Sequence, residues 1–228
     1  MLLLFDVDGT LVRGAAKEHA AALHEALCEV HGVKTAEIRV VEPAGRTDGE
    51  ISRMLLLDAG ISAERIDERA PDVRAACWQA YARLCPDDLS EFVVPGMPDL
   101  LASLSGRPGV RLSLVTGNFE PVARLKLARA GLGRWFAPGQ GAFGSDAEDR
   151  AALPGMARKR AGANGISYRR DETIVIGDTP RDIACARADG VRCIAVTTGP
   201  YGLEALRGAD AIARDAAALG SLLLAGDL

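Results

Sequence analysis

The feature that most constrains the fold of this 228-residue chain is a regular alternation of short apolar strands and helices from residue 93 onward. Each predicted strand is a brief apolar run, and a stretch with helical apolar spacing follows it. Such alternation builds right-handed strand–helix–strand units around a parallel sheet that helices cover on both faces. The predicted strands are 110–115, 142–143, 173–176, 193–196 and 211–212, and the predicted helices are 98–104, 120–130, 150–161, 180–188, 203–206 and a last one after Asp215. The expected fold class is α/β.

The first strand of the expected sheet is separated from the others. Residues 2–5 are a short buried strand by their composition, and the next convincing strand comes only after residue 93. The stretch between them has helical spacing at 15–30, 48–59 and 63–84. Open α/β sheets bind ligands beyond the carboxyl ends of their strands, so a helical unit inserted there would lie over a binding site as a lid. We expect hinges near residues 13–14 and 88–92.

Composition and charge exclude several classes of protein. The net charge is −4, without the excess of Lys and Arg that nucleic-acid binders concentrate on one face, so no nucleic-acid partner is expected. The apolar N-terminal run is interrupted by Asp6 and Asp8 and is too short to span a membrane, so we expect no membrane partner and a cytoplasmic protein. The five cysteines show no C-x-x-C spacing, and His19 and His24 do not align on a helix face, so neither disulfides nor a zinc site is expected.

Acidic and turn residues follow three of the predicted strands. The segments are Asp6-Val-Asp8-Gly-Thr10, Thr116-Gly117-Asn118 and Gly177-Asp178-Thr179-Pro180-Arg181-Asp182. They should meet at one edge of the sheet. Clustered carboxylates without Cys or His are ligands for a hard cation, Mg²⁺ first, and they repel one another unless a cation binds or their pKa values shift. With Mg²⁺ bound, phosphate is the natural substrate group, and the Thr116 hydroxyl and the amides of Gly117 and Asn118 are further donors.

In this order the motifs resemble those of the haloacid dehalogenase superfamily, in the phosphatase branch that includes phosphoglycolate phosphatases. The family's first motif, D-x-D-x-[TV], matches residues 6–10; its second, a Ser or Thr after an apolar strand, matches Thr116; its fourth, G-D-x-x-x-D, matches residues 177–182. The resemblance spans essentially the whole chain. It implies a Rossmann-like parallel sheet core, residues 1–14 and 90–228, with an inserted α-helical cap domain, residues 15–89.

The resemblance also implies roles for the carboxylates. Asp6 would attack phosphorus, and Asp8 would first protonate the leaving group and then activate water. The metal, Mg²⁺, would be held by the carboxylates of Asp6 and Asp178 and by the backbone carbonyl of Asp8, with Asp182 outside the direct ligands. The spacing suits these roles, because residues i and i+2 of an extended segment lie on one side of it.

The third family motif departs from the usual pattern. The family generally places a Lys before the helix that precedes the fourth motif, whereas residues 144–150 of this chain read Gly-Ser-Asp-Ala-Glu-Asp-Arg. We assign the role to Arg150, whose charge would neutralise Asp6 and the phosphoryl oxygens, although a guanidinium fork is not equivalent to the point charge of a Lys. Lys159 and Lys126 are the rival candidates.

The predicted lid carries one more candidate for substrate binding. Arg46 lies where capped members of the family have a loop that closes onto the substrate, and it could bind a second anionic group. The alternative is a solvated turn in which Thr47 or Asp48 caps the next helix. Three large side chains at helical spacing are expected in the core of the lid rather than on a binding surface: Trp78, Tyr81 and Leu84.

The predicted function is Mg²⁺-dependent hydrolysis of a small phosphomonoester, of the phosphoglycolate or sugar phosphate class, through an aspartyl-phosphate on Asp6. A phosphomutase of the β-phosphoglucomutase type would use the same Asp6 and Asp8, and its products would distinguish it. A non-catalytic, phosphate-binding regulatory module is the alternative from another class, since a fold does not fix a function. The intact Asp6 and Asp8 pair argues against it. The sequence leaves substrate identity and oligomeric state open.

Overall fold

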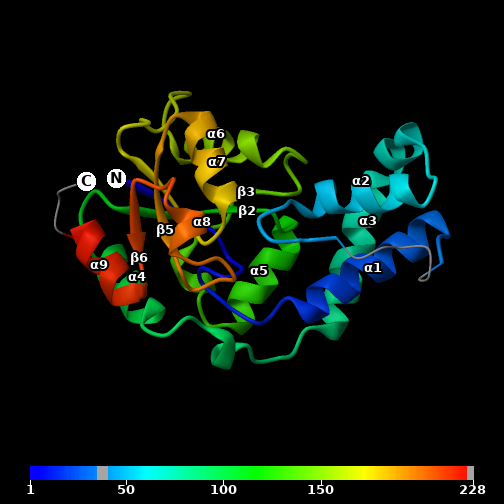
Figure 1. Ribbon diagram of the computed structural model, residues 1–228, viewed down its shortest axis with the longest axis horizontal. Helices are drawn as coiled ribbons and strands as arrows, with labels where there is room; N and C mark the ends of the chain where they lie inside the picture. The colour runs from blue at the N-terminus through cyan, green and yellow to red at the C-terminus, as the bar shows by residue number, and fades with distance from the viewer. Residues whose placement is uncertain (35–40, 225–228) are drawn as a thin grey trace.

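The computed structural model describes residues 1–34 and 41–224, and its centre is a parallel sheet (Figure 1). Among the described residues the sheet has six strands, in the order β3-β2-β1-β4-β5-β6. They are β1 Leu2–Phe5, β2 Arg111–Thr116, β3 Ala142–Phe143, β4 Thr173–Gly177, β5 Arg192–Val196 and β6 Ala211–Ala213. The α/β prediction is confirmed, and the N-terminal strand lies in the middle of the sheet between β2 and β4.

Helices cover both faces of the sheet, because successive strand residues point to opposite sides. In β1, Leu3 and Phe5 pack in one buried cluster while Leu2 and Leu4 pack in the other. The first cluster includes residues of α4 (Met97–Ser105), α5 (Glu120–Arg129) and α9 (Ala216–Leu224). The second includes residues of α6 (Leu153–Ala161), α7 (Pro180–Asp189) and α8 (Leu203–Leu206). Each central strand is therefore buried on both faces, which explains why it reads as a continuous apolar run.

One predicted helix begins later than expected. Residues 150–161 were predicted as one helix, but Arg150–Ala152 forms a 3₁₀ turn and α6 starts at Leu153. Pro154 explains the break, because proline has no N–H to donate to the carbonyl of Arg150. Two other 3₁₀ turns lie at Ser90–Phe92 and Gly133–Trp135.

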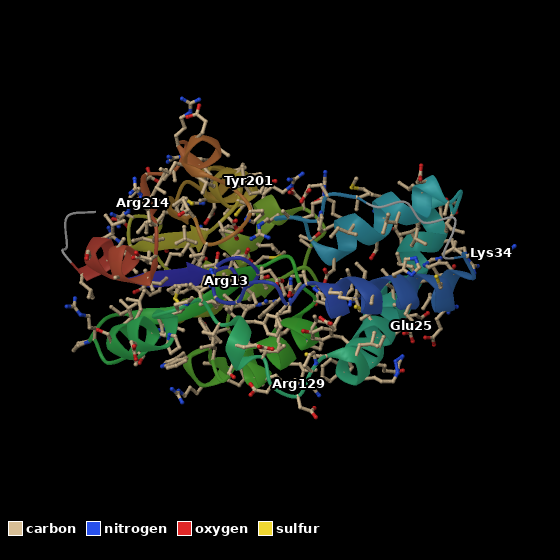
Figure 2. The ribbon with its side chains drawn as sticks, turned by 60° about the horizontal axis from the view of Figure 1, so that its bottom comes forward. Arg13, Glu25, Lys34, Arg129, Tyr201 and Arg214 are labelled. Atoms are coloured by element: carbon tan, nitrogen blue, oxygen red, sulfur yellow. The ribbon has the colours of Figure 1, made fainter. Side chains whose placement is uncertain are left out.

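The residues between β1 and the rest of the sheet form three helices at one end of the molecule (Figures 1 and 2). They are α1 (Lys17–His31), α2 (Asp48–Asp58) and α3 (Ala63–Leu84), and together we call them the helical insertion. The domain boundaries at 15 and 89 stay a prediction, and residues 35–40 of that range lie outside the described residues. Within the described ranges, no helix combines the length and apolar character needed to cross a bilayer.

The prediction for the three large side chains of α3 was only partly right. Tyr81 is buried between α3 and the sheet domain, but Trp78 and Leu84 are exposed at its surface. Helical spacing alone cannot tell which turn of a long helix reaches past its neighbours. Tyr81 instead lies against Lys126 and His19, both of which matter below.

The two chain crossings between sheet and insertion run side by side. Val12 and Val93 form an antiparallel bridge, and the amide of Arg13 donates to the carbonyl of Phe92 at 2.8 Å. Arg13 lies near the middle of the molecule in Figure 2. The predicted hinges are therefore paired with each other, so a movement of the insertion would bend both crossings together.

Candidate active site

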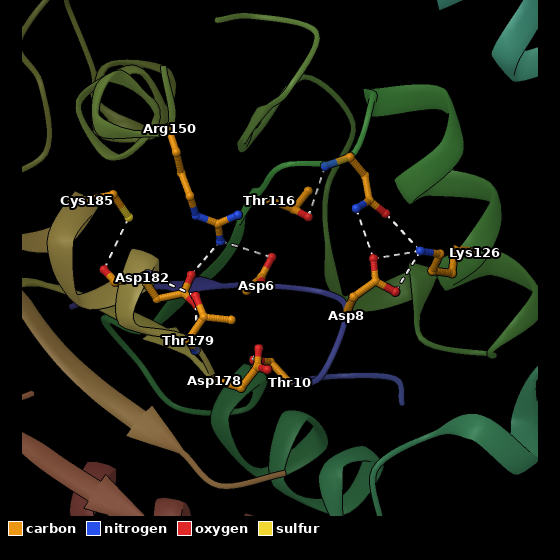
Figure 3. A network of polar contacts seen from close by, with 11 residues as sticks. Asp6, Asp8, Thr10, Thr116, Lys126, Arg150, Asp178, Thr179, Asp182 and Cys185 are labelled. Atoms are coloured by element: carbon orange, nitrogen blue, oxygen red, sulfur yellow. Dashed lines mark hydrogen bonds and ion pairs between the residues drawn. The ribbon is translucent and has the colours of Figure 1, made fainter. Parts of the chain in front are cut away.

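The three motif segments lie together at the carboxyl edge of the sheet, as predicted. Phe5 is in register with Leu114 of β2 and Ile176 of β4, so the chain leaves all three strands at the same level. The residues that follow are Asp6, Thr116 and Asp178, and all three are buried. Figure 3 shows their side chains grouped around Asp6. Parallel pairing of β1 with both neighbours is what brings residues so distant in sequence into one site.

Three carboxylates form a tight cluster there. Oxygens of Asp6, Asp178 and Asp182 lie within 4.8 Å of one another. Burial, opposed by Arg150 and reinforced by Asp182, raises the pKa of Asp6 to about 7. Burial and the neighbouring Asp6 and Asp182 raise the pKa of Asp178 to about 8. The donor set consists only of oxygens, and its charges repel, so the cluster fits a hard divalent cation.

Glycines make room for the Asp178 carboxylate. A Cβ placed on Gly9 would lie 2.2 Å from its Oδ2, and one on Gly199 would lie 1.7 Å from the same atom. Gly9 also has φ +83°, which other residues rarely adopt. Thr10 donates to Asp178 Oδ1 at 3.2 Å. The glycine of the first motif is thus needed for space as well as for the turn, and Gly199 is a site residue that the motifs did not indicate.

Asp182 is held by bonds of its own. The Thr179 amide and hydroxyl donate to Asp182 Oδ2 at 3.0 and 2.7 Å, and they complete the capping box that starts α7. Arg150 donates to the other oxygen, Oδ1, at 2.5 Å. Since both oxygens already accept hydrogen bonds, Asp182 suits a place beside a metal rather than among its direct ligands.

Arg150 is the cation beside Asp6. Its Nη2 lies 3.3 Å from Asp6 Oδ1, and the side chain is only 6% exposed. The 3₁₀ turn that carries it is capped by Asp149, whose carboxylate accepts from the Ala151 amide at 2.9 Å. Arg150 Nε is buried without a hydrogen-bond partner. One face of the guanidinium therefore binds carboxylates while one buried donor is free for a further acceptor.

The two lysines proposed as rivals of Arg150 lie elsewhere. Lys159 is exposed on α6. Lys126 on α5 is fully buried, and its Nζ lies 2.7 Å from both carboxylate oxygens of Asp8 and 2.9 Å from Asn118 Oδ1. Asn118 Nδ2 also donates to Asp8 Oδ2, at 2.9 Å. The Asp8 side chain thus faces away from the Asp6 cluster toward α5 (Figure 3).

The surroundings of Asp8 act on its pKa in the direction opposite to those of Asp6. Burial raises the pKa of Asp8, but Lys126 and His19 lower it more, and the net shift is downward. Sequence reasoning missed this pairing, although a signal was present. Lys126 occupies a position of the apolar face of α5, one helical turn after Val122 and Ala123, where a Lys would need a buried partner.

Arg46 is the predicted site residue whose side chain lies apart from the carboxylates. Its guanidinium bonds Glu50 and the carbonyl of Glu42. The Arg46 backbone instead lies against Gly117, where a Cβ would be 1.9 Å from the Arg46 carbonyl oxygen. Thr47 does cap α2, accepting from the Glu50 amide at 3.0 Å, but it is buried rather than in a solvated turn. Binding of an anion by Arg46 stays a prediction.

Comparison with known proteins points to one family. The model of the family described as haloacid dehalogenase-like hydrolase matches residues 3–187. A phosphoglycolate phosphatase of Rhodospirillum rubrum is 32% identical over 225 residues, covering 97% of this chain and 90% of that protein. A phosphoglycolate phosphatase of Neisseria meningitidis is 29% identical over 221 residues, covering 96% of this chain and 88% of that protein.

Solved structures share the fold. A hydrolase from Pseudomonas syringae superimposes with a TM-score of 0.67 at 21% identity, covering 99% of each chain. A putative beta-phosphoglucomutase from Bacteroides vulgatus has a TM-score of 0.65 at 22% identity, covering 98% of this chain and 87% of its own. At these identities the similarity establishes a common fold.

The carboxylate cluster predicts how stability depends on pH and on metal. Because the folded-state pKa values of Asp6 and Asp178 lie above their unfolded values, the metal-free protein should lose stability as pH rises from about 4 to about 8. Added Mg²⁺ should raise Tm more at about pH 8 than at about pH 5, since binding displaces protons at low pH. Calorimetry of wild type, Asp178→Asn and the exposed control Glu91→Gln measures this. A Tm response to Mg²⁺ that survives in Asp178→Asn would contradict the assignment.

Proposed function

Since this chain belongs to the haloacid dehalogenase-like hydrolases and is a phosphatase of that family, we propose that it hydrolyses a small phosphomonoester through an aspartyl-phosphate on Asp6 with Mg²⁺ bound. Phosphoglycolate is the first candidate substrate, because relatives that align with nearly the whole chain are named for it. The observation that carries the proposal is the placement of Asp6 between a carboxylate cluster and the guanidinium of Arg150.

The residues fit a magnesium ion. The carboxylates of Asp6 and Asp178 and the backbone carbonyl of Asp8 would hold it, and Asp182 would stay outside, bonded to Arg150 and Thr179. When bound, Mg²⁺ supplies charge neutralisation for the carboxylates and for a phosphoryl oxygen. The raised pKa values of Asp6 and Asp178 support this assignment, since two of the carboxylates cannot easily be ionised together without a cation.

Asp6 acts as the nucleophile in this mechanism. One of its oxygens attacks phosphorus, the bond to the leaving oxygen breaks, and a phosphoryl group is left on the Asp6 carboxylate. Arg150 neutralises the charge that spreads over the phosphoryl oxygens, and its free Nε–H adds a donor. Thr116, with the amides of Gly117 and Asn118, completes the set of donors on the β2 side.

Asp8 acts as the acid and then as the base. It gives a proton to the departing oxygen and takes one from the water that attacks the aspartyl-phosphate. Its bond to Lys126 favours the carboxylate form in the protein without substrate. The negative charge of a bound phosphoryl group raises the pKa of a nearby carboxyl, so substrate binding itself helps Asp8 take up the proton it donates.

The helical insertion acts as the cap in this proposal, with residues 15–89 as the cap and 1–14 and 90–228 as the catalytic core. The segment before α2 covers the loop after β2, since the Asp48 amide donates to the Gly117 carbonyl at 2.8 Å. Thr47 Oγ1 donates to the Glu148 carbonyl at 2.6 Å on the neighbouring loop. Such a cover excludes bulk water and leaves space for a small leaving group.

Substitution of the two motif aspartates tests the proposed chemistry. Asp6→Asn should abolish Mg²⁺-dependent phosphate release from phosphoglycolate, because the amide is not a nucleophile. Asp8→Asn should lower kcat by roughly 10²–10⁴-fold, the usual contribution of general acid–base catalysis, while Mg²⁺ still binds. Phosphate release and isothermal calorimetry measure the two effects. An Asp6→Asn enzyme with near wild-type turnover would sink the mechanism, and an isomerised sugar phosphate without free phosphate would indicate a mutase.

Removal of the cation beside Asp6 provides a second test. Arg150→Ala should reduce kcat by at least roughly 10²–10³-fold, because the transition-state charge loses a buried donor. Lys159→Ala is the matched control on the neighbouring helix, and its turnover should equal that of wild type because Lys159 is exposed. Steady-state hydrolysis of phosphoglycolate compares them. The reverse ranking of the two variants would reassign the third motif.

A further inference from the structure

Asp48 is a buried acid that the proposed chemistry does not use. It is the first residue of α2 and is only 3% exposed. Its Oδ2 accepts from the Phe119 amide at 2.7 Å and pairs with His19 Nε2 at 3.0 Å. The Asp48 amide donates to the Gly117 carbonyl. This one residue of the helical insertion therefore bonds the loop after β2 through both its main chain and its side chain.

The Asp48 carboxylate supplies what α5 lacks at its own start. Phe119 is the N-cap of α5, and no side-chain hydrogen bond of its own caps that helix. The amides of Phe119 and Glu120 bond instead to Asp48 Oδ2 and to Ser145 Oγ, at 2.7 Å each. A buried N–H without a partner is costly, so the conformation of this loop depends on an acceptor from the insertion.

The same short stretch of chain holds the Asp8 side chain. Asn118, directly before Phe119, donates to Asp8, and Lys126 lies two helical turns further along α5. The insertion also covers Lys126, whose Nζ lies 6.0 Å from the centre of the Tyr81 ring. The other neighbour of that ring is His19, at 5.6 Å between ring centres. Asp48, His19 and Tyr81 thus form a continuous set of contacts around the groups that hold Asp8.

We propose that Asp48 is a positioning residue for Asp8. With the insertion docked, its carboxylate fixes the start of α5, so that Asn118 and Lys126 hold Asp8 in place for proton transfer. The inference rests on the proposed function, in which Asp8 is the acid and base. It means that docking of the insertion and placement of Asp8 are one event, because the acceptor at the Phe119 amide comes from the insertion.

The competing explanation is that Asp48 merely helps to hold the insertion against the sheet. Arg53 provides the matched control for that explanation. It bonds Glu148 on the loop after β3, with Arg53 Nη2 2.9 Å from Glu148 Oε1, but it touches neither α5 nor the loop after β2 in the contacts of the described residues. Arg53→Gln should weaken docking without removing the acceptor at Phe119.

The experiment measures kcat/KM for p-nitrophenyl phosphate and phenyl phosphate in the full-length wild type, Asp48→Ala, Asp48→Asn and Arg53→Gln, with Mg²⁺ present. This quotient reports the steps through loss of the leaving group, and phenyl phosphate, with the poorer leaving group, depends more on a well-placed acid. Asp48→Ala should lower kcat/KM for phenyl phosphate at least about tenfold more than for p-nitrophenyl phosphate. Asp48→Asn keeps an oxygen acceptor and should restore the wild-type ratio, and Arg53→Gln should change both substrates equally.

An equal loss for both substrates in Asp48→Ala, matching that in Arg53→Gln, would overturn the proposal. If Asp48→Ala does not fold, Asp48→Ser replaces it, because its hydroxyl is too short to reach Phe119. Amide hydrogen exchange at Phe119 is the second measurement and needs no turnover. Exchange should be faster in the Ala or Ser variant and unchanged in Asp48→Asn, and equal exchange in all variants contradicts the inference. Failure of the proposed function appears separately, as phosphate release that survives in Asp6→Asn.

Discussion

Repulsion among buried carboxylates is the constraint on which the rest of the site depends. Parallel pairing of β1 with β2 and β4 forces Asp6, Asp178 and Asp182 to one edge of the sheet, where their oxygens lie within 4.8 Å of one another. The nearby groups all act on this repulsion. Arg150 bonds two of the carboxylates, Thr10 donates to the third, and the remaining charge favours a divalent cation. A phosphate ester suits this place because it binds where positive charge has been gathered.

The two aspartates of the first motif have different surroundings although they are two residues apart. Asp6 lies in the carboxylate cluster, and its pKa is raised to about 7. Asp8 turns toward α5, where Lys126 and Asn118 hold it and its pKa is lowered. Such a separation lets one carboxylate serve as nucleophile and the other as acid and base. The insertion contributes to the second environment only, through His19 and the ring of Tyr81 over Lys126.

Features set by local pattern could be predicted from the sequence, whereas features set by contact between distant segments could not. The strand ends at Asp6, Thr116 and Asp178 were found because a buried strand followed by turn residues is a local pattern, and the parallel sheet then brings them together. The partner of Lys126 was missed because a buried Lys signals that it needs a partner without identifying one. The roles of Asp48 and Gly199 depend on which loops meet across the site, and neither residue stands out by its local sequence.

The central claim is that Asp6 carries the phosphoryl group, and trapping that group tests it most directly. The wild-type protein would be mixed with Mg²⁺ and phosphoglycolate labelled at phosphorus, quenched in acid within one turnover, and digested for peptide mapping. The account predicts label on the N-terminal peptide at Asp6 and none in Asp6→Asn. Turnover with no label on the protein, or label at any other residue, would contradict it.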